Sequence, residues 1–230
     1  MNANSETTPR DPAKVQEMFG KISKPYDCIN RLFSLGIDVY WRKQLAVSVA
    51  QNQPKSVLDL ATGSGDVALL LQKQGYDVTG MDFCAPMLEL AKKKGVKKLL
   101  QGDAMNMPFP DNSFDAITIA FGFRNFVNYE LALKEIRRVL KPGGMVHILE
   151  FSNPSRWFCG LYYFYLSKVM PFMAGLISRN PKAYSYLANS VEKFPDAESL
   201  SWLLAVTGYE KVSWQKYTFG IVAIHHGSKK

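Results

Sequence analysis

One stretch constrains the fold more than any other: residues 56–66, with the sequence SVLDLATGSGD. Val57 to Leu60 is a short, mostly apolar run of the kind that forms a buried parallel strand, and it breaks into a turn of small residues. Residues 67–74 then have the pattern of a helix, and Gly75 follows directly. Strand, glycine turn and helix in this order open the nucleotide-binding half of a doubly wound α/β sheet.

The glycine turn lacks the G-x-G-x-x-G spacing of dinucleotide sites. It has Asp59 near the end of the strand, Gly63, Ser64 and Gly65 in the turn, and Asp66 at the helix start. The glycines let the backbone approach a ligand, and the helix start offers free N–H groups. A carboxylate there disfavours a pyrophosphate but not a cation. The expected ligand is therefore S-adenosylmethionine, which carries a sulfonium and an ammonium group.

Two more candidate binding positions follow predicted strands. Asp82 ends the strand predicted at 76–82, where a carboxylate can accept both ribose hydroxyls of a nucleoside. The alternative role for Asp82 is to cap the helix predicted at 86–93. Asp103 and Ala104 follow the third strand, where a carboxylate can accept from an adenine amine and a backbone N–H can donate to a ring nitrogen.

A second motif block strengthens this interpretation. The glycine turn resembles that of class I methyltransferases, although Ala61 stands where many members have glycine. A G-D-A…P-F…F-D block of small-molecule methyltransferases is also matched, at Asp103, Ala104, Pro108, Phe109, Phe114 and Asp115. The two blocks occur in the order that the resemblance requires.

Composition and charge limit the size of the protein and the kinds of partner that it can bind. The 230 residues, 47% of them hydrophobic, fit one α/β domain spanning 1–230. The net charge of +8 admits nucleic acid or an anionic membrane, but the densest basic cluster, at 92–98, lies at a predicted helix end, where a solvated face is the simpler explanation. The scattered cysteines and histidines form no metal-ligating set, so no metal is expected. No signal peptide opens the chain, which predicts a cytoplasmic protein.

The remaining segments complete a doubly wound, mostly parallel seven-stranded sheet. Residues 1–10 are predicted to be disordered and residues 11–53 to form a helical cap, in which Asp38 caps a helix from Val39 to about Ala50 with Trp41 and Leu45 on one face. Further elements are expected as a helix at 130–140 and strands at 114–121, 145–151, 209–214 and 218–225. The last two strands suggest a hairpin, which makes the final strand antiparallel.

An aromatic stretch at 157–177 is nearly as long as a membrane span. Lys168, Pro171 and several tyrosines argue against insertion. We expect a helix, kinked or ended near Pro171, within a helical insertion at 155–195 that covers the substrate side of the sheet. Packing on the core and a lid for an apolar substrate are the two open interpretations.

The sequence FGFRN at 121–125 places Arg124 and Asn125 at the carboxyl end of the fourth strand. Ligands bind at that edge in open α/β sheets. The two polar side chains should therefore face the methyl donor. A loop salt bridge without a chemical role is the alternative.

Four motifs resemble those of the ubiquinone/menaquinone biosynthesis C-methyltransferases. They are Y-D-x-x-N, S-x-G and W-R within residues 26–42, F-G-x-R-N at 121–125, L-E-F-S-x-P at 149–154, and Y-L-x-x-S-V with F-P at 186–195. The matches run in order from about residue 19 to the end. The sequence ATGS at 61–64 departs from the frequent Ala-Gly-Gly-Thr, Ala120 replaces a serine of some members, and Asp103 stands where some have asparagine.

The resemblance implies methyl transfer from S-adenosylmethionine to a ring carbon of a prenylated quinol: demethylmenaquinol, the benzoquinol precursor of ubiquinone, or both. Ring carbon is a poor nucleophile until a neighbouring hydroxyl loses its proton, so the reduced ring is the expected substrate. Arg124 should stabilise the developing phenolate. A water held by Arg124 or Asn125 could carry the proton, and Tyr26 is a second candidate for contact with the ring hydroxyl.

Other classes stay open at this stage. The enzyme could methylate another small molecule or RNA, although the aromatic residues and the basic clusters occupy different segments, which disfavours nucleic acid. The missing G-x-G-x-x-G argues against an NAD-dependent oxidoreductase, and the intact motifs argue against a non-catalytic binding module. The membrane-bound tail of a prenylated substrate and the positive charge predict peripheral contact with the inner face of an anionic membrane. Whether the chain forms homo-oligomers is left open.

Overall fold

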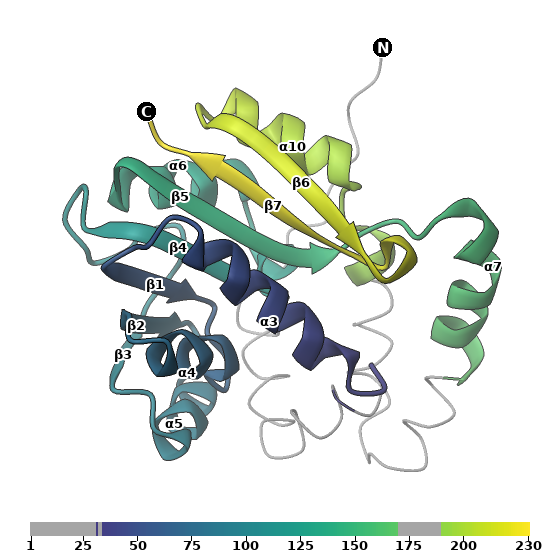
Figure 1. Ribbon diagram of the computed structural model, residues 1–230, viewed down its shortest axis with the longest axis horizontal. Coiled ribbons are helices and arrows are strands. Elements are labelled where there is room, and N and C mark those ends of the chain that lie inside the picture. Colours follow the sequence, from purple (N-terminus) through teal and green to yellow (C-terminus); the bar gives the residue numbers. More distant parts are fainter. Residues whose placement is uncertain (1–30, 32–33, 170–189) are drawn as a thin grey trace.

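The computed structural model describes residues 31, 34–169 and 190–230 (Figure 1). Seven strands form one sheet in the order β3-β2-β1-β4-β5-β7-β6. The strands are β1 (Ser56–Leu60), β2 (Asp77–Asp82), β3 (Lys98–Gln101), β4 (Phe114–Ala120), β5 (Leu140–Phe151), β6 (Glu210–Tyr217) and β7 (Val222–Ser228). Strand β7 is antiparallel to both of its neighbours, and the other pairs are parallel. The predicted sheet and its antiparallel final strand are confirmed.

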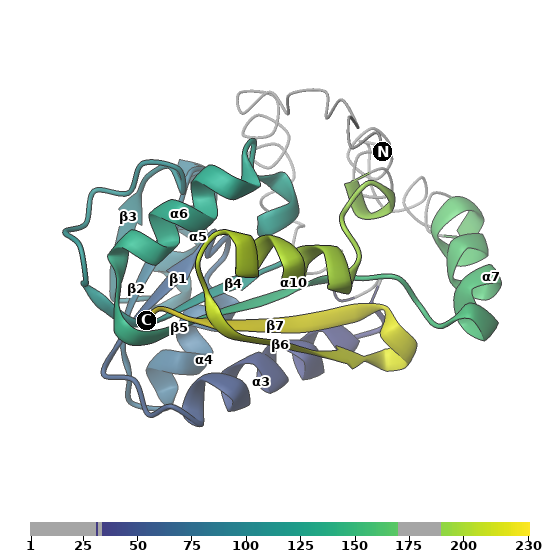
Figure 2. The same ribbon diagram turned by 90° about the horizontal axis from the view of Figure 1, so that it is seen from above.

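Helices cover both faces of this sheet. They are α3 (Ile37–Ala50), α4 (Asp66–Lys73), α5 (Ala85–Lys94), α6 (Tyr129–Val139), α7 (Arg156–Phe164) and α10 (Ala197–Val206), with the short turns η1 (Phe123–Asn125), η2 (Tyr165–Val169) and η3 (Thr218–Gly220). Helices α6 and α10 lie on one face, and α3 and α4 lie on the other (Figure 2). The fold is therefore doubly wound, as the glycine turn predicted.

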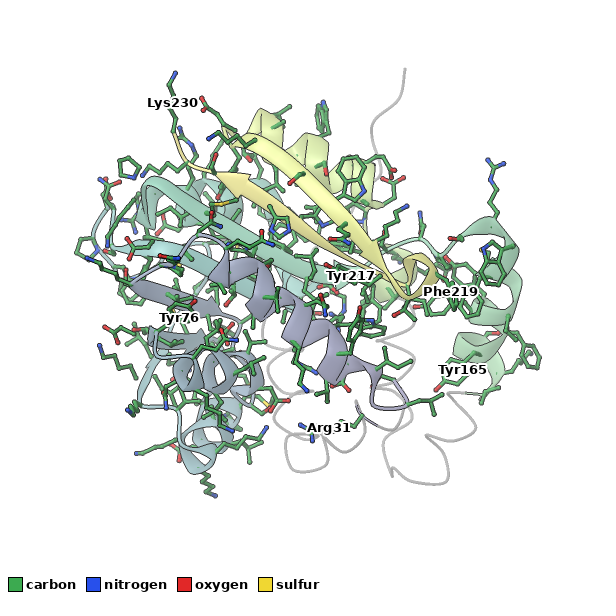
Figure 3. The ribbon with its side chains drawn as sticks, in the orientation of Figure 1. Arg31, Tyr76, Tyr165, Tyr217, Phe219 and Lys230 are labelled. Carbon is green, nitrogen blue, oxygen red and sulfur yellow. The ribbon has the colours of Figure 1, made fainter. Side chains whose placement is uncertain are left out.

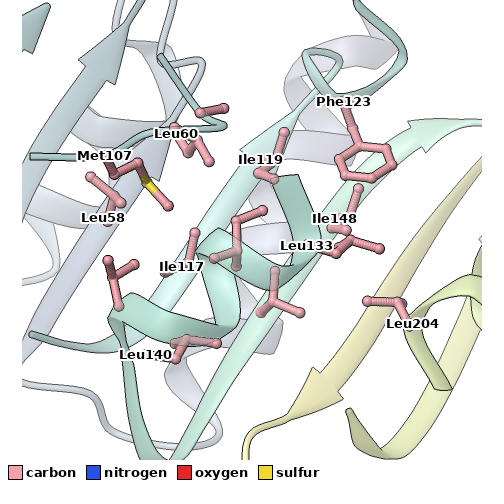
Figure 4. Packing of buried hydrophobic residues seen from close by; sticks show 14 of the residues in the cluster. Leu58, Leu60, Met107, Ile117, Ile119, Phe123, Leu133, Leu140, Ile148 and Leu204 are labelled. Atoms are coloured by element: carbon pink, nitrogen blue, oxygen red, sulfur yellow. The ribbon is translucent and has the colours of Figure 1, made fainter. Parts of the chain in front are cut away.

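Each face has its own core. Leu58 of β1 packs in a cluster with Leu133 of α6 and Leu204 of α10 (Figure 4). Its neighbour Val57 packs in a second cluster with Leu45 of α3 and Leu71 of α4. Successive side chains of a strand point to opposite faces. Because both faces are buried, the central strands are apolar at nearly every position.

Helix α3 begins at a different residue from the one predicted. Gly36 occupies the cap position, with a φ of 78° that favours glycine. Asp38 lies in the first turn and accepts a hydrogen bond from the hydroxyl of Ser34 at 2.8 Å, so its predicted capping role is wrong. Trp41 and Leu45 are both buried in the same core cluster, which confirms that they lie on one face of the helix. The remainder of the predicted cap and the polar tail before it lie outside the described residues.

Helix α7 extends beyond the sheet to one side (Figure 1). Tyr162 is buried, whereas Trp157, Leu161 and Phe164 are exposed. The helix continues into η2, which has π-helical geometry. Helix α7 is therefore not a core helix. Residues 170–189 of the predicted insertion, Pro171 among them, lie outside the described residues, whereas Ser190 and Phe194 at its end are buried. Within the described part of the chain, no helix is long and apolar enough to cross a membrane.

Candidate functional site

A cavity lies at the carboxyl ends of β1, β2 and β4 and beside the residues after β3. Parallel strands bring their carboxyl ends to the same edge of the sheet, so residues far apart in sequence meet there. The predicted site residues that line this cavity are Asp59, Gly63, Ser64, Asp82, Asp103, Ala104 and Asn125. The cavity therefore unites most of the binding positions that the motifs indicated.

Asp82 connects the end of β2 to the glycine turn. Its Oδ2 accepts a hydrogen bond from the Gly63 N–H at 2.7 Å, and its Oδ1 accepts one from the Cys84 N–H at 2.8 Å. Burial raises the pKa of Asp82 although these hydrogen bonds lower it. The alternative that Asp82 caps α5 is wrong, because Cys84 occupies the cap position.

Asp59 is a buried carboxylate beneath the turn. It accepts hydrogen bonds from the hydroxyls of Thr62 at 2.6 Å and Thr118 at 2.7 Å, and from the Ala68 N–H at 3.1 Å. Burial raises the pKa of Asp59 to about 6, against the lowering effect of these three donors. At neutral pH the group is mainly ionised, so it gives the cavity a negative charge that favours a cationic ligand.

The negative charge of Asp66 is partly neutralised by neighbouring cations. Lys94 of α5 forms an ion pair with Asp66 at 2.7 Å and also donates to the Ser64 hydroxyl at 2.9 Å. Burial raises the pKa of Asp66, but Lys94, Arg42 and Arg31 together lower it below its usual range. These cations offset much of the carboxylate charge, so the repulsion of a pyrophosphate inferred from Asp66 is weaker than predicted.

Asp103 and Ala104 form the cavity wall after β3. The Asp103 Oδ1 accepts a hydrogen bond from the Met105 N–H at 2.9 Å, which holds the carboxylate at the start of a tight turn. Ala104 is buried. A Cβ added at Gly102, just before them, would lie 2.9 Å from the Met81 sulfur, so the Met81 side chain would have to shift. The close packing of this turn on β2 fixes its position at the cavity edge.

The two glycines of the turn serve different purposes. Gly63 lines the cavity, and a Cβ added there would come no closer than 3.5 Å to the Met87 Cε. Gly65 does not line the cavity, and its Cβ would lie 2.6 Å from the Val96 Cγ2 and 3.0 Å from the Ala91 Cβ. The prediction that Gly65 lets the backbone approach a ligand is therefore wrong. Gly65 instead lets the turn pack closely against α5 and the residues after that helix.

Alanine substitutions should separate these roles. Both glycines have positive φ, 55° and 83°, so each variant bears backbone strain. Gly65→Ala adds a steric clash and should lower the free energy of unfolding by about 1–3 kcal/mol more than Gly63→Ala. Urea unfolding of both variants measures the difference. Equal destabilisation would show that the packing at Gly65 has been misjudged.

Arg124 is buried and paired with Glu150 rather than lining the cavity. Its side chain is 5% exposed and that of Glu150 is fully buried, with Nη1 2.9 Å from Oε1. The Arg124 Nη1 also donates to the Phe121 carbonyl, and Nε lies 3.4 Å from the Ser190 hydroxyl. In the described part of the chain these bonds use Nε and Nη1, so no described group accepts from Nη2. The guanidinium is held in a fixed orientation.

Two aromatic rings in tilted contact link Arg124 to the cavity. The rings of Phe121 and Phe151 lie 5.0 Å apart. The Arg124 guanidinium carbon is 5.2 Å from the Phe151 ring centre, and that of Arg42 is 5.5 Å from the Phe121 ring centre. Each arginine thus rests against one of the two rings. Arg42 lines the cavity, and Arg124 lies at the other end of this ring pair.

Sequence reasoning missed Glu150 and Arg42 as site residues. A glutamate within the apolar run at 147–151 was a usable signal, because a buried carboxylate needs a partner. Arg42 belongs to a helix that precedes the sheet, and its spacing gave no sign that it lines the cavity. Tyr26, the third predicted catalytic residue after Arg124 and Asn125, lies outside the described residues.

Comparison with known proteins identifies the relatives. The ubiE/COQ5 methyltransferase family matches residues 7–229. A demethylmenaquinone methyltransferase of Thermus thermophilus is 47% identical over 220 residues, which cover 92% of this chain and 100% of the relative. A protein of the same name from Deinococcus radiodurans is 43% identical over 224 residues, covering 94% and 92%.

Solved structures support the fold. A SAM-dependent methyltransferase of Thermotoga maritima, described as a possible histamine N-methyltransferase, has a TM-score of 0.70 at 21% identity and covers 93% of this chain and 99% of its own. The cyclase SpnF has a TM-score of 0.69 at 16% identity, covering 95% and 96%. The fold thus serves more than one reaction. The family match and the curated relatives decide the class: the chain belongs to the ubiE/COQ5 methyltransferase family.

Proposed function

We propose that this enzyme transfers the methyl group of S-adenosylmethionine to a ring carbon of demethylmenaquinol, and that it also accepts the benzoquinol precursor of ubiquinone. The observation that carries the proposal is the cavity at the carboxyl edge of the sheet, where four aspartates surround a glycine turn. A sulfonium donor with an ammonium group fits that charge. The curated relatives named demethylmenaquinone methyltransferase support the substrate class.

The donor is proposed to lie along the strand ends. Asp82 would accept from the ribose hydroxyls with the lone pairs that the backbone N–H groups of Gly63, Cys84 and Phe83 leave available. Asp103 would accept from the adenine amine, and the backbone N–H of Ala104 would donate to the ring. The Gly63 backbone would lie against the donor, because its missing Cβ leaves that side of the turn open.

The acceptor ring is proposed to lie beside the loop after β4. Cavity residues of this loop are mostly apolar and include Phe121, Phe126 and Val127, which suits an aromatic ring. Arg124 does not line the cavity, so we propose that the oxygen next to the reacting carbon reaches in toward its Nη2, which would stabilise the negative charge. A water held by Asn125 would take the phenol proton. The methyl–sulfur bond breaks as the carbon–carbon bond forms, which leaves S-adenosylhomocysteine and a methylated dienone. The methylated carbon then loses its proton to solvent water, which restores the aromatic phenolate, and the phenolate oxygen takes a proton back from water.

Titration calorimetry tests the donor assignment. The purified protein should bind S-adenosylmethionine and S-adenosylhomocysteine, and NAD at the same concentrations should give no heat. Competition between the two adenosyl compounds checks that they share one site. Binding of NAD in place of both would contradict the proposal.

We further propose that α7 and the β6–β7 turn contact an anionic membrane surface, where a prenylated substrate resides. Trp157, Leu161 and Phe164 recur at helical spacing on α7 and are 72%, 63% and 58% exposed. Phe219 of the turn packs on the Trp157 ring at 5.0 Å and is itself exposed (Figure 3). Exposed Arg156 and Lys168 flank this apolar stripe, and residues 151–169 contain no acidic side chain. Apolar and aromatic side chains flanked by cations are typical of interfacial helices.

Flotation with lipid vesicles tests this surface. The wild type should float with vesicles of phosphatidylcholine and phosphatidylglycerol, and less with phosphatidylcholine alone, because the anionic lipid adds attraction to the basic residues. A Trp157→Gln/Phe164→Gln variant should float about tenfold less. Trp202→Gln on α10, a residue that is 66% exposed, is the matched control and should leave flotation unchanged. Failure of the wild type to float, or equal loss in the control, would contradict the proposed surface.

A further inference from the structure

Arg42 has an unusual place in the cavity. Of the described residues that line it, Arg42 alone carries a positive charge, whereas Asp59, Asp66, Asp82 and Asp103 carry negative charges. A cavity built only for cations would gain nothing from a guanidinium in its wall, since the arginine would repel the ligand. One positive charge among four negative ones indicates a ligand with one anionic group, whose other groups are cations or hydrogen-bond donors that aspartates can bind.

The structure holds Arg42 in one orientation. Its Nη1 forms an ion pair with Asp38 one turn earlier on α3, and Asp38 in turn accepts from the Ser34 hydroxyl. The guanidinium rests against the Phe121 ring, and its side chain is 14% exposed. A guanidinium has five N–H donors, and one carboxylate partner does not use them all. The group is therefore oriented in advance and retains donors for a ligand.

The charges are unevenly distributed along the cavity. Asp82 and Asp103 follow β2 and β3, whereas Arg42 lies beside Phe121 after β4 and close enough to Asp66 to lower its pKa. S-adenosylmethionine has a matching asymmetry. Its nucleoside end offers hydroxyls and an amine, and its other end carries an ammonium and a carboxylate. With the nucleoside at Asp82 and Asp103, the amino-acid end falls beside Arg42.

We propose that Arg42 binds the carboxylate of the donor's methionine portion. The proposal rests on the proposed use of S-adenosylmethionine. It adds a contact at the amino-acid end of the donor, which determines the orientation of the donor in the cavity. Arginine suits this task, because its planar fork matches a carboxylate with two parallel hydrogen bonds. Asp38 is then a positioning residue, which aims the guanidinium without touching the donor.

A comparison of two donors isolates this contact. Calorimetry measures the affinity of the protein for S-adenosylmethionine and for decarboxylated S-adenosylmethionine, which lacks only the carboxylate. The wild type should bind the complete donor about tenfold or more tightly than the decarboxylated one. Arg42→Gln should weaken binding of the complete donor by a similar factor and leave the decarboxylated donor almost unaffected, so the ratio approaches one.

Lys43 provides the matched control. It is the next residue on α3, is exposed and does not line the cavity, so Lys43→Gln removes the same charge from the same helix. That variant should keep the wild-type ratio. If Arg42→Gln keeps the ratio, or weakens both donors equally, Arg42 has only a structural role and the inference fails. If the wild type binds neither donor, the proposed function itself fails.

Discussion

Arg124→Ala should lose most of the methyl-transfer activity and part of the stability as well. Removal of an oriented donor from a developing oxyanion lowers kcat by about 100–1,000-fold. The same change leaves Glu150 buried without its cation, which costs roughly 3–5 kcal/mol. Affinity for S-adenosylmethionine should be retained in the folded fraction, because Arg124 does not line the donor cavity.

A second variant separates catalysis from folding. Arg124→Met combined with Glu150→Gln removes both charges of the buried pair, which in other proteins is often neutral. Glutamine is chosen because the backbone N–H groups of Arg124 and Phe151 donate to the two oxygens of Glu150, and its single carbonyl oxygen still accepts from one of them. This double variant should unfold closer to the wild-type temperature than Arg124→Ala, yet remain as inactive. Near-normal turnover in the double variant would reject a chemical role for Arg124.

Asp82→Ala should nearly abolish donor binding. The carboxylate receives the Gly63 N–H at 2.7 Å and is proposed to receive the ribose hydroxyls, so its removal disturbs both the turn and the ligand. Loss of two hydrogen bonds to a charged acceptor corresponds to a fall in affinity of about 100-fold or more. Calorimetry with S-adenosylmethionine measures it.

Asp77→Ala serves as the control for this result. Asp77 starts the same strand, β2, and forms an exposed ion pair with Lys98 at 2.7 Å, away from the cavity lining. Its removal should change donor affinity less than about threefold, since exposed ion pairs contribute little. Similar losses in the two variants would indicate a general effect of charge on β2. Unchanged affinity in Asp82→Ala would contradict the ribose assignment.

The parts of the site that follow from topology could be predicted from the sequence. Asp82 ends strand β2 and Asn125 follows strand β4. Parallel strands end at one edge of the sheet, so the order of the elements was enough to predict that both residues lie at the cavity. The resemblance to a quinone methyltransferase family was confirmed by the family match.

The parts that depend on packing between distant elements could not be predicted. Arg124 pairs with Glu150 because β4 and β5 align Ala120 with Leu149, and no pattern in either strand specifies that register. Gly65 is constrained by Val96, a residue on the far side of α5 in the sequence. Local sequence shows that a glycine is present but not which neighbour requires it.

Methylation of the reduced ring tests the central claim most directly. The purified protein is incubated with S-adenosylmethionine that carries a labelled methyl group and with demethylmenaquinol kept reduced, and mass spectrometry locates the label in the product. We predict one labelled methyl group on a ring carbon of the reduced substrate and none on the oxidised quinone. Label on an oxygen, equal labelling of the oxidised quinone, or no labelled product would contradict the account.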